Sequence, residues 1–388
     1  MDKRQFLRIS SALAAGSFIP LKGEAFVEGM KKPILRTLGK TGIKIPVVSC
    51  GIIPQNNKAL IKALFESGIK HFDSAWEYQN GRNDIMVGEM LREYGRDNFI
   101  ISTKVLLPTD QQTGQYLKDA TTAAFMEQLE ITLKRLGVET VDILYLHKPP
   151  TREAALNEEM LNGLRKAKEQ GKTKFVGFSS HSNQVELINT AIESNFYEVG
   201  LVGYNFRQDN IVKPALERAN KAGLGIVAMK VFAGEYQAKE RNKPVNKTAA
   251  LKWVLQDKNV HTSILTFKTY EDFESLIPVM HDIDLTTKEK NDLALAYNET
   301  GMYCLGCEKC RRSCVDKLPV PDLMRAYMYT YGYRQISGGR KVLDEFELPT
   351  LPCSNCNICS INCTAGFDLK AKIADIVRLR NVPFDFLG

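Results

Sequence analysis

Eight of the nine cysteines lie in two identically spaced runs in the last quarter of the 388-residue chain. The runs consist of Cys304, Cys307, Cys310 and Cys314, and of Cys353, Cys356, Cys359 and Cys363. Each run reads C-x2-C-x2-C-x3-C, a spacing with which thiolates on tight turns ligate cubane iron–sulfur clusters. The spacing therefore predicts that this part of the chain binds [4Fe-4S] clusters.

The pair of runs resembles the two-cluster bacterial ferredoxins. In those proteins the first three cysteines of a run bind one cluster and the fourth binds the other. The resemblance implies two ligand sets: Cys304, Cys307, Cys310 with Cys363, and Cys353, Cys356, Cys359 with Cys314. The interval between the runs is longer than in a compact ferredoxin and predicts a helix from Asp322 to about Tyr331. We expect a stretched, mostly helical version of that fold.

Two other interpretations of the eight thiols stay open. Four disulfides are one, although disulfide-dense scaffolds are typically small, whereas these runs follow a long, cysteine-poor body. Zinc is the other, although zinc sites favour pairs of C-x-x-C over triplets with a trailing fourth cysteine. The ninth cysteine, Cys50, lies in an apolar segment and is expected to be a buried core thiol.

Four polar residues that can transfer or orient protons follow apolar segments in the first half of the chain. They are Asp73 and Tyr78 in HFDSAWEY, Lys104 in IISTKV and His147 in ILYLHKPP. Each alone has an ordinary structural interpretation, as a cap, a partly buried aromatic ring or a rim charge. Their positions at the ends of consecutive apolar segments indicate one shared site.

The segments that must position these residues alternate between short apolar runs and amphipathic stretches. The predicted strands are Val47–Ile53, His71–Ala75, Phe99–Val105, Ile143–His147, Lys174–Ser179, Gly200–Asn205, Gly225–Val231 and Ser263–Phe267. The predicted helices are Leu60–Ser67, Ile85–Tyr94, Leu117–Leu136, Glu158–Gln170, Val185–Glu193, Ile211–Lys221 and Lys247–Gln256. Strands that are apolar throughout, each followed by a helix, indicate a parallel sheet buried on both faces. Eight such units in about 250 residues predict an α/β fold of the (β/α)8 TIM-barrel type, with catalytic groups at the C-terminal ends of the strands.

A doubly wound open sheet is the alternative fold. It typically binds a dinucleotide through a Gly-rich loop after its first strand. The corresponding segment from Cys50 to Pro54 reads CGIIP and contains no such loop. The barrel is therefore the predicted fold, followed by a small, mostly helical, ferredoxin-like iron–sulfur domain.

Five segments resemble the aldo-keto reductase family: RTLGKTGIKIP, FDSAWEYQNGRNDIMVGEMLR, FIISTKV, LKRLGVETVDILYLH and KFVGFSS. The resemblance covers about Leu35 to Met280. It implies an oxidoreductase that moves hydride between NADP(H) or NAD(H) and a small carbonyl or alcohol substrate. It also implies a catalytic tetrad made of Tyr78, Lys104, Asp73 and His147.

Carbonyl reduction explains these residue types. Hydride addition leaves negative charge on oxygen, which needs a proton donor and electrostatic support. A free tyrosine, with a pKa of about 10, holds its proton too tightly for reversible transfer, and a nearby ammonium lowers that pKa. Tyr78 would then be the acid–base and Lys104 would lower its pKa. Asp73 would fix Lys104, and His147 would orient the carbonyl oxygen.

The resemblance further implies a nicotinamide site beside the later strands. Ser179 would bond the carboxamide, and Tyr204 would stack on the ring. Lys230 to Gly234 would pass near the pyrophosphate, and Lys268 could meet a ribose 2′-phosphate. On position alone, Trp76, Tyr116 and the aromatic stretch from Tyr327 to Tyr333 are expected to line the substrate pocket.

Composition and the N-terminus bear on partners and location. Hydrophobic residues make up 44% of the chain and charged residues 25%, which is typical of a folded protein. The net charge of +7 forms no basic stripe interleaved with aromatics, so no nucleic-acid partner is expected. No apolar run reaches the roughly 20 residues of a membrane span. The first residues, MDKRQFLR, resemble a twin-arginine export signal with Lys3 in place of the first arginine. We expect an exported, periplasmic protein, with a cytoplasmic location as the alternative.

The sequence thus predicts a signal-like segment over residues 1–30, a barrel over 34–285 and a dicluster domain with a C-terminal tail over 296–388. Nicotinamides move two electrons as hydride, whereas each cluster moves one, and no flavin motif joins the two. The clusters could exchange electrons with a redox partner protein, or they could be structural. The alternative from another class is an electron-transfer iron–sulfur protein with a catalytically silent barrel.

Overall fold

The computed structural model describes residues 32–53, 57–110, 113–234, 245–298, 301–354 and 356–387. By its contacts the chain divides into two units, Met1–Lys32 and Pro33–Gly388. All the elements below belong to the second unit. The predicted export signal over residues 1–30 lies outside the described residues.

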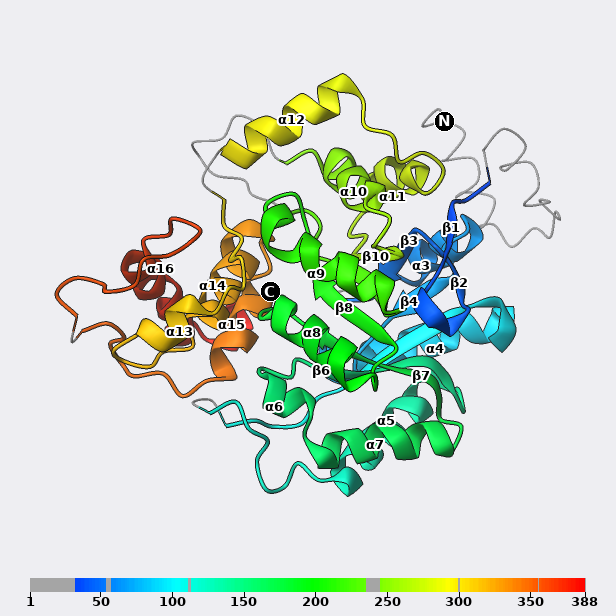
Figure 1. Cartoon of the computed structure of the whole chain (residues 1–388), viewed down its shortest axis with the longest axis horizontal. Helices are drawn as coiled ribbons and strands as arrows, with labels where there is room; N and C mark the ends of the chain where they lie inside the picture. Colours follow the sequence, from blue (N-terminus) through cyan, green and yellow to red (C-terminus); the bar gives the residue numbers. More distant parts are fainter. Residues whose placement is uncertain are drawn as a thin grey trace. The chain divides into compact units, whose positions relative to one another are not determined.

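Eight parallel strands close into a barrel (Figure 1). They are β3 (Val48–Gly51), β4 (His71–Asp73), β5 (Ile100–Val105), β6 (Val141–His147), β7 (Thr173–Ser180), β8 (Val199–Gly203), β9 (Gly225–Met229) and β10 (Thr262–Leu265). Each strand pairs with the next, and β10 closes the sheet by pairing with β3. The predicted barrel is confirmed, and the open-sheet alternative is wrong.

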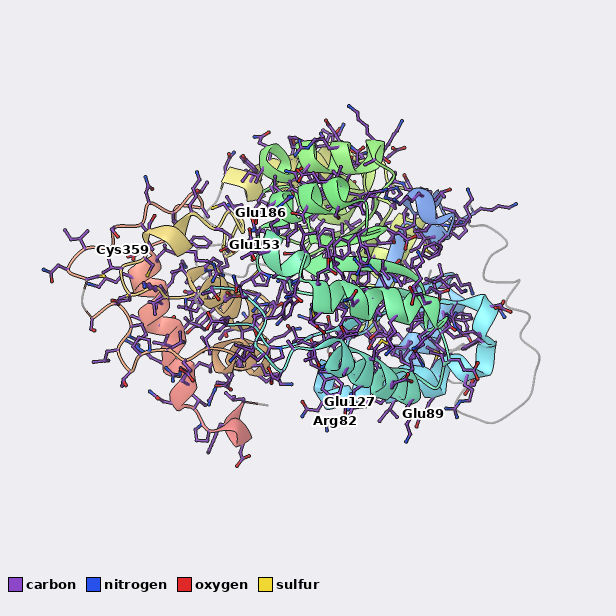
Figure 2. The ribbon with its side chains drawn as sticks, turned by 60° about the horizontal axis from the view of Figure 1, so that its bottom comes forward. Arg82, Glu89, Glu127, Glu153, Glu186 and Cys359 are labelled. Atoms are coloured by element: carbon purple, nitrogen blue, oxygen red, sulfur yellow. The ribbon has the colours of Figure 1, made fainter. Side chains whose placement is uncertain are left out.

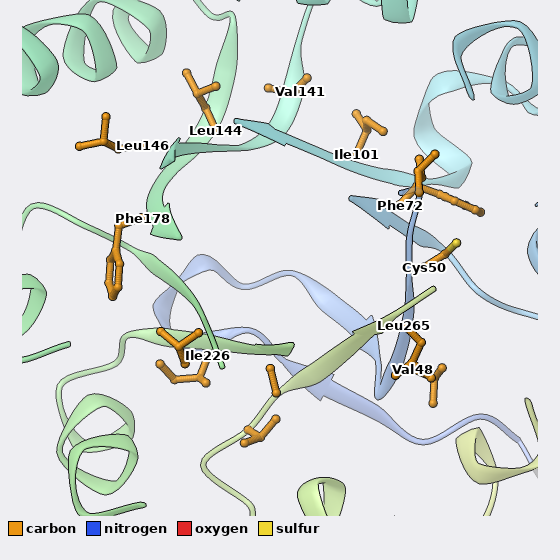
Figure 3. Packing of buried hydrophobic residues seen from close by; sticks show 14 of the residues in the cluster. Val48, Cys50, Phe72, Ile101, Val141, Leu144, Leu146, Phe178, Ile226 and Leu265 are labelled. Carbon is orange, nitrogen blue, oxygen red and sulfur yellow. The ribbon is translucent and has the colours of Figure 1, made fainter. Parts of the chain in front are cut away.

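The strands are apolar throughout because both faces of the sheet are buried. All residues of β6 are buried: Leu144 and Leu146 belong to the layer between sheet and helices, whereas Ile143 and Tyr145 belong to the core inside the barrel. Figure 3 shows part of the outer layer, where Leu144 and Phe178 come from neighbouring strands. This alternation decides which side chains at the strand ends face the barrel mouth.

Helices follow the strands. They are α3 (Lys58–Glu66), α4 (Arg82–Leu91), α5 (Thr122–Leu136), α6 (Arg152–Ala155), α7 (Glu158–Glu169), α8 (Gln184–Ser194), α9 (Asp209–Lys221), α10 (Lys247–Gln256) and α11 (Tyr270–Leu276). Several begin at a capping side chain: Thr121 accepts from the Ala124 N–H, and Asn157 from the Met160 N–H. The cap at Thr121 explains why α5 begins at Thr122 rather than at the predicted Leu117.

A two-stranded antiparallel hairpin, β1 (Leu35–Thr37) and β2 (Lys44–Pro46), precedes the barrel and is not predicted from the sequence. Its Leu38 and Ile45 are fully buried in the core inside the barrel. The Lys40 N–H donates to the Gly223 carbonyl at 2.8 Å, just before β9 begins. The hairpin therefore covers the N-terminal end of the barrel, away from the strand ends that carry the predicted site.

After α12 (Thr287–Asn298) the chain enters the C-terminal segment, which we define as the described residues between 301 and 387. It contains α13 (Lys309–Ser313), α14 (Val320–Tyr327), a π-helical turn (Met328–Gly332), α15 (Ile336–Asp344) and α16 (Leu369–Ile376). No strand occurs among these described residues. The helical content and the helix near 322–331 agree with prediction, but these elements do not by themselves establish a ferredoxin-like domain.

The C-terminal segment has a core of its own and also packs on the barrel. Leu323, Leu343 and Ile373 belong to its own core. A second cluster joins Phe206, after β8, to Met328 of the π-helical turn. Of the helices that the structure describes, none is long and apolar enough to cross a membrane.

Candidate active site

A cavity of about 270 Å³ lies at the C-terminal ends of the barrel strands. Asp73 and His147 line it from the ends of β4 and β6, and Tyr78 lines it from the loop after β4. The C-terminal segment supplies a further wall, made of Arg325, Tyr329, Tyr333, Gln335, Gly338, Lys341, Val342 and Glu345. The site is therefore shared by two parts of the chain that are far apart in sequence.

Lys104 and Asp73 form a buried ion pair. Lys104 Nζ lies 2.5 Å from Asp73 Oδ2 and donates to the Ser74 carbonyl at 2.6 Å. Asp73 Oδ1 accepts from Ser102 Oγ at 2.6 Å, and Ser102 Oγ lies 2.9 Å from His71 Nε2. The two charged side chains are each only 2% exposed, so each depends on the other for compensation of its charge. The parallel pairing of β4 with β5 sets this geometry, because Asp73 stands opposite Ser102 in register.

Tyr78 lies beside this pair. Lys104 Nζ is 4.9 Å from the centre of the Tyr78 ring, and no hydrogen bond joins Nζ to the Tyr78 hydroxyl, both residues being described. Burial raises the pKa of Tyr78 well above its ordinary value, and the Asp73 and Glu77 carboxylates raise it further. The expected lowering of this pKa by Lys104 does not prevail here, because burial and the neighbouring carboxylates raise the pKa.

His147 is bonded to a residue that sequence reasoning missed. Its Nδ1 lies 2.8 Å from Glu77 Oε1. Burial lowers the pKa of His147, which favours the neutral ring. With its proton on Nδ1, beside the Glu77 carboxylate, a neutral His147 ring leaves Nε2 as an acceptor. The ring of His181 follows, with its centre 6.0 Å from that of His147.

The structure brings only one of the two predicted nicotinamide contacts toward the inside of the barrel. Ser179 stands opposite His147 in register and is 1% exposed, and its hydroxyl has no hydrogen-bond partner among the described residues. Ser179 is not among the residues that line the described cavity, so its bond to the nicotinamide carboxamide stays a prediction. Tyr204 instead packs on Trp253, with ring centres 5.3 Å apart, and donates to Asp257 at 3.0 Å. It lies in the outer layer, so the predicted stacking on the nicotinamide is wrong.

The predicted phosphate-binding side chains contact the C-terminal segment. Lys230 Nζ lies 3.2 Å from the Tyr329 hydroxyl. Lys268 Nζ donates to the Tyr333 carbonyl at 3.1 Å. Both lysines line the cavity, as residues that contact a ligand are expected to do. Each of them, however, is hydrogen-bonded to a residue of the C-terminal segment.

Gly234, the last of the predicted cofactor residues, is also covered. Its φ of 92° lies in the region that favours glycine, and a Cβ added at Gly332 would stand 2.3 Å from its carbonyl oxygen. The described cavity is smaller than the roughly 300–1,000 Å³ that drug-sized ligands fill. The C-terminal segment therefore covers the positions at which the resemblance places the cofactor phosphates.

Several residues of the cavity wall are beyond the reach of sequence reasoning. Arg325 and Glu345 belong to this group because their contacts depend on how the C-terminal segment docks. Glu77 belongs to it because its contact with His147 joins the loop after β4 to the end of β6. The predicted aromatic stretch supplies Tyr329 and Tyr333 to the cavity lining. The other two residues proposed on position alone, at 76 and 116, do not line it.

Cys314 lies with the second cysteine run. All nine cysteines are free thiols. A small apolar cavity is lined by Cys314, Cys353, Cys356 and Cys359, and Figure 2 labels Cys359 in the C-terminal segment. Asp316 Oδ2 accepts from the Cys353 N–H at 3.1 Å, which ties the two stretches together. Burial raises the pKa of Cys353 to about 11, with nearby Cys314 adding to the effect.

Cys363 lies with the first run. Cys307 Sγ is 3.6 Å from Thr364 Oγ1, the residue after Cys363. Burial raises the pKa of Cys310 to about 12, and neighbouring negative groups, Cys307 and Cys363 among them, contribute. One cavity thus joins Cys314 to the second run, and a side-chain contact brings the residue after Cys363 to Cys307, while the two ligand sets stay a prediction. In the described ranges, no group of three or more His, Cys, Asp or Glu side chains meets the geometry of a metal-ion site.

Known proteins are similar in sequence to part of this chain. An L-glyceraldehyde 3-phosphate reductase of Escherichia coli is 34% identical over 160 residues, which are 38% of this chain and 45% of that enzyme. A pyridoxal 4-dehydrogenase of Microbacterium luteolum is 26% identical over 242 residues, 51% of this chain and 70% of that enzyme. The chain thus spans less than half of the length of the first of these relatives.

Solved structures show the same fold. The holo form of an aldo-keto reductase from Bacillus halodurans superposes with a TM-score of 0.55 at 18% identity, covering 68% of this chain and 96% of that one. A thermostable aldo-keto reductase in complex with the inhibitor epalrestat gives a TM-score of 0.54 at 21% identity, covering 68% and 99%.

A closed (β/α)8 barrel with acid–base side chains at its C-terminal mouth defines a barrel enzyme. Residues 50–248, just over half of the chain, match the model of the Aldo/keto reductase family. The chain belongs to this family. The match ends before the C-terminal segment, whose cysteines therefore have to be interpreted from their own arrangement.

Proposed function

We propose that the barrel transfers hydride between a nicotinamide cofactor and a small carbonyl or alcohol, with Tyr78 as the proton donor. The observation that carries this proposal is the cavity where Tyr78, His147 and the Asp73–Lys104 pair meet at the strand ends. Membership of the family and the unpaired hydroxyl of Ser179 support the nicotinamide cofactor. When bound, the nicotinamide supplies the hydride.

The side chains of the chain do the rest. During reduction the O–H bond of Tyr78 breaks as its proton passes to the substrate oxygen, which otherwise carries the negative charge. The phenolate left on Tyr78 lies close to the Lys104 ammonium, which Asp73 holds in place. A proton from solvent restores the tyrosine. In the oxidative direction, Nε2 of His147 can accept a hydrogen bond from the substrate hydroxyl.

Replacement of Tyr78 tests this role. Tyr78→Phe removes the proton donor and keeps the ring, so kcat should fall about 100-fold to 10,000-fold, while the affinity for NADPH changes little. Tyr94→Phe is the matched control, because it removes a hydroxyl that bonds exposed Glu66 far from the cavity lining. Equal turnover by Tyr78→Phe and Tyr94→Phe would contradict the assignment.

For the C-terminal segment we propose two [4Fe-4S] clusters, held by the crossed sets that end in Cys363 and Cys314. The support is the spacing of the runs together with the contacts that join Asp316 to Cys353 and Thr364 to Cys307. The thiolates of a cubane bind different irons, so they stand further apart than the ligands of one ion.

The clusters would exchange single electrons with a redox partner protein or stabilise the segment. Anaerobic purification followed by iron analysis and EPR distinguishes these roles. Signals that appear on addition of substrate favour electron exchange, whereas clusters that stay silent during full turnover favour a structural role.

We also propose that residues 1–30 direct export to the periplasm by the twin-arginine route. The support is the sequence KRQFLR followed by an Ala- and Ser-rich stretch. This route carries folded proteins, which suits a chain that receives its clusters before export. A reporter fused to these residues should reach the periplasm, and Arg4→Lys should retain it in the cytoplasm. Export that survives Arg4→Lys would refute the proposal.

A further inference from the structure

Three basic side chains separate the main cavity from a smaller one beside it. His181, Lys230 and Arg325 line both cavities. His181 and Lys230 follow β7 and β9 of the barrel, whereas Arg325 belongs to α14 of the C-terminal segment. The proton transfer proposed above uses none of the three.

Arg325 is buried and incompletely paired. It is 8% exposed, and its Nη2 lies 3.0 Å from Asp322 Oδ1 and 3.3 Å from Glu345 Oε2. Its Nε is buried without a hydrogen-bond partner in the part of the chain that the structure describes. A buried donor that stays unpaired is costly, which indicates a place for an acceptor that the described residues do not supply.

Lys230 is held in a strained conformation beside the same place. Its φ is 58°, a left-handed conformation that non-glycine residues seldom adopt and that clusters at functional sites. The hydroxyl of Tyr329, 3.2 Å away, accepts from its ammonium. No described carboxylate forms an ion pair with Lys230, and burial lowers the pKa of its ammonium. Cys304 of the first cysteine run also lines the smaller cavity.

The pKa of Tyr329 indicates that the electrostatic potential around its hydroxyl is positive. Burial by itself raises the pKa of this phenol, but Lys230 and Arg325 outweigh it and lower the pKa below the ordinary value. Lys148, which also lines the cavity, acts in the same direction. Negative charge is therefore favoured at the Tyr329 oxygen, in spite of the nearby carboxylates of Asp322 and Glu345.

We propose that Lys230, Arg325 and Tyr329 form a subsite that binds an anionic group of the substrate, a carboxylate or a phosphate. The inference rests on the proposed carbonyl reduction and narrows its substrate class. The three subsite residues line the same cavity as Tyr78 and His147, so a substrate whose anionic group is close to its carbonyl can reach both the subsite and the reacting groups. Short oxo acids and phosphorylated hydroxyaldehydes have this arrangement.

Pairs of substrates that differ only in the anion provide the test. Full-length protein with its clusters is assayed with succinic semialdehyde against butanal, and with glyceraldehyde 3-phosphate against glyceraldehyde. The wild type should prefer the charged member of at least one pair by about tenfold to 100-fold in kcat/KM, and the preferred pair identifies carboxylate or phosphate. Tyr329→Phe, which removes the hydroxyl bonded to Lys230, should weaken that preference while turnover of the neutral member persists. Tyr331→Phe, on the same π-helical turn but outside the cavity lining, should keep it.

A second readout is independent of turnover. Malonate and inorganic phosphate, tested separately by thermal shift, should raise the melting temperature of the wild type but not that of Lys230→Met. If this shift occurs without reduction of any carbonyl, the subsite stands and the proposed reaction fails. If neutral and charged substrates are reduced equally by wild type and Lys230→Met, the reaction stands and the subsite is refuted. If Lys230→Met raises the KM for NADPH equally with both members of a pair, the anion that this lysine binds belongs to the cofactor, and the substrate subsite is also refuted.

Discussion

The barrel mouth and the C-terminal segment hold their reactive side chains in different ways. At the mouth, Asp73 and Lys104 are almost fully buried and are fixed by hydrogen bonds from neighbouring strands. In the C-terminal segment the eight cysteines are only partly buried, and contacts such as that of Asp316 with Cys353 hold the chain around them. The Asp73–Lys104 pair is thus fixed by the barrel strands, whereas the cysteines lie on loops and short helices that few contacts of the described side chains hold.

The largest expected effect, and the strongest test of this comparison, is at the cysteines. Cys359→Ser should reduce iron per chain by about half, because each run-centred set binds its own cluster, and the C-terminal segment should become sensitive to proteolysis. The barrel should keep its secondary structure. Cys50→Ala is the control, since this buried thiol lies in β3 and belongs to the barrel core. Unchanged iron in Cys359→Ser would exclude the proposed ligand set.

A charge removed at the mouth should destabilise the barrel itself. Lys104→Met leaves the Asp73 carboxylate buried without compensation, which typically costs about 3–5 kcal/mol of unfolding free energy. Adding Asp73→Asn to the same chain should recover part of this loss, and a double-mutant cycle by denaturant unfolding measures the coupling. Strict additivity of the two substitutions would contradict the buried pair.

A pH-dependent effect of similar size is expected at Asp84, which is fully buried and accepts a hydrogen bond from Ser74. Burial raises the pKa of Asp84 to about 7. Because the folded state then binds this proton more tightly than the unfolded state does, stability should fall as pH rises from about 4 to about 7. The loss should approach 4 kcal/mol relative to Asp84→Asn, which cannot titrate. Parallel stability curves for the two proteins would show that the carboxyl titrates normally.

The smallest expected effect tests the contact between the barrel and the C-terminal segment. Glu345 lies 3.1 Å from Lys148 of the barrel and 3.3 Å from Arg325. Glu345 is 41% exposed, so Glu345→Gln should cost only about 1 kcal/mol or less. Glu274→Gln, an exposed glutamate on α11, makes the same charge change elsewhere. A loss several times larger than that of the control would mean that docking depends on this one residue.

The sequence predicts the barrel well because its signal is local. Each strand is a short apolar run, and the ends of β4, β5 and β6 fall within two residues of the predicted ends. The predicted role of Tyr204 is wrong for a physical reason. Leu201 faces the inside of the barrel, and Tyr204, three positions later along an alternating strand, therefore faces the helices. Because both faces of the sheet are apolar, the sequence pattern does not show which alternate positions of a strand face the inside of the barrel.

The contribution of the C-terminal segment could not be predicted. Arg325 and Tyr329 reach the cavity only because the segment docks over the strand ends, and such docking leaves no periodic signal. The cysteine spacing predicts ligand sets, since thiolate geometry depends on local turns. The use of those ligands depends on long-range distances that spacing does not encode.

The central claim is that the barrel transfers hydride directly, independently of the cysteines. The most direct measurement is a single-turnover reaction with NADPH deuterated at the transferred position, followed by mass analysis of the alcohol product. The account predicts one deuterium on the former carbonyl carbon, both in the wild type and in Cys359→Ser. Deuterium lost to solvent, or a product formed only when the clusters are intact, would contradict it.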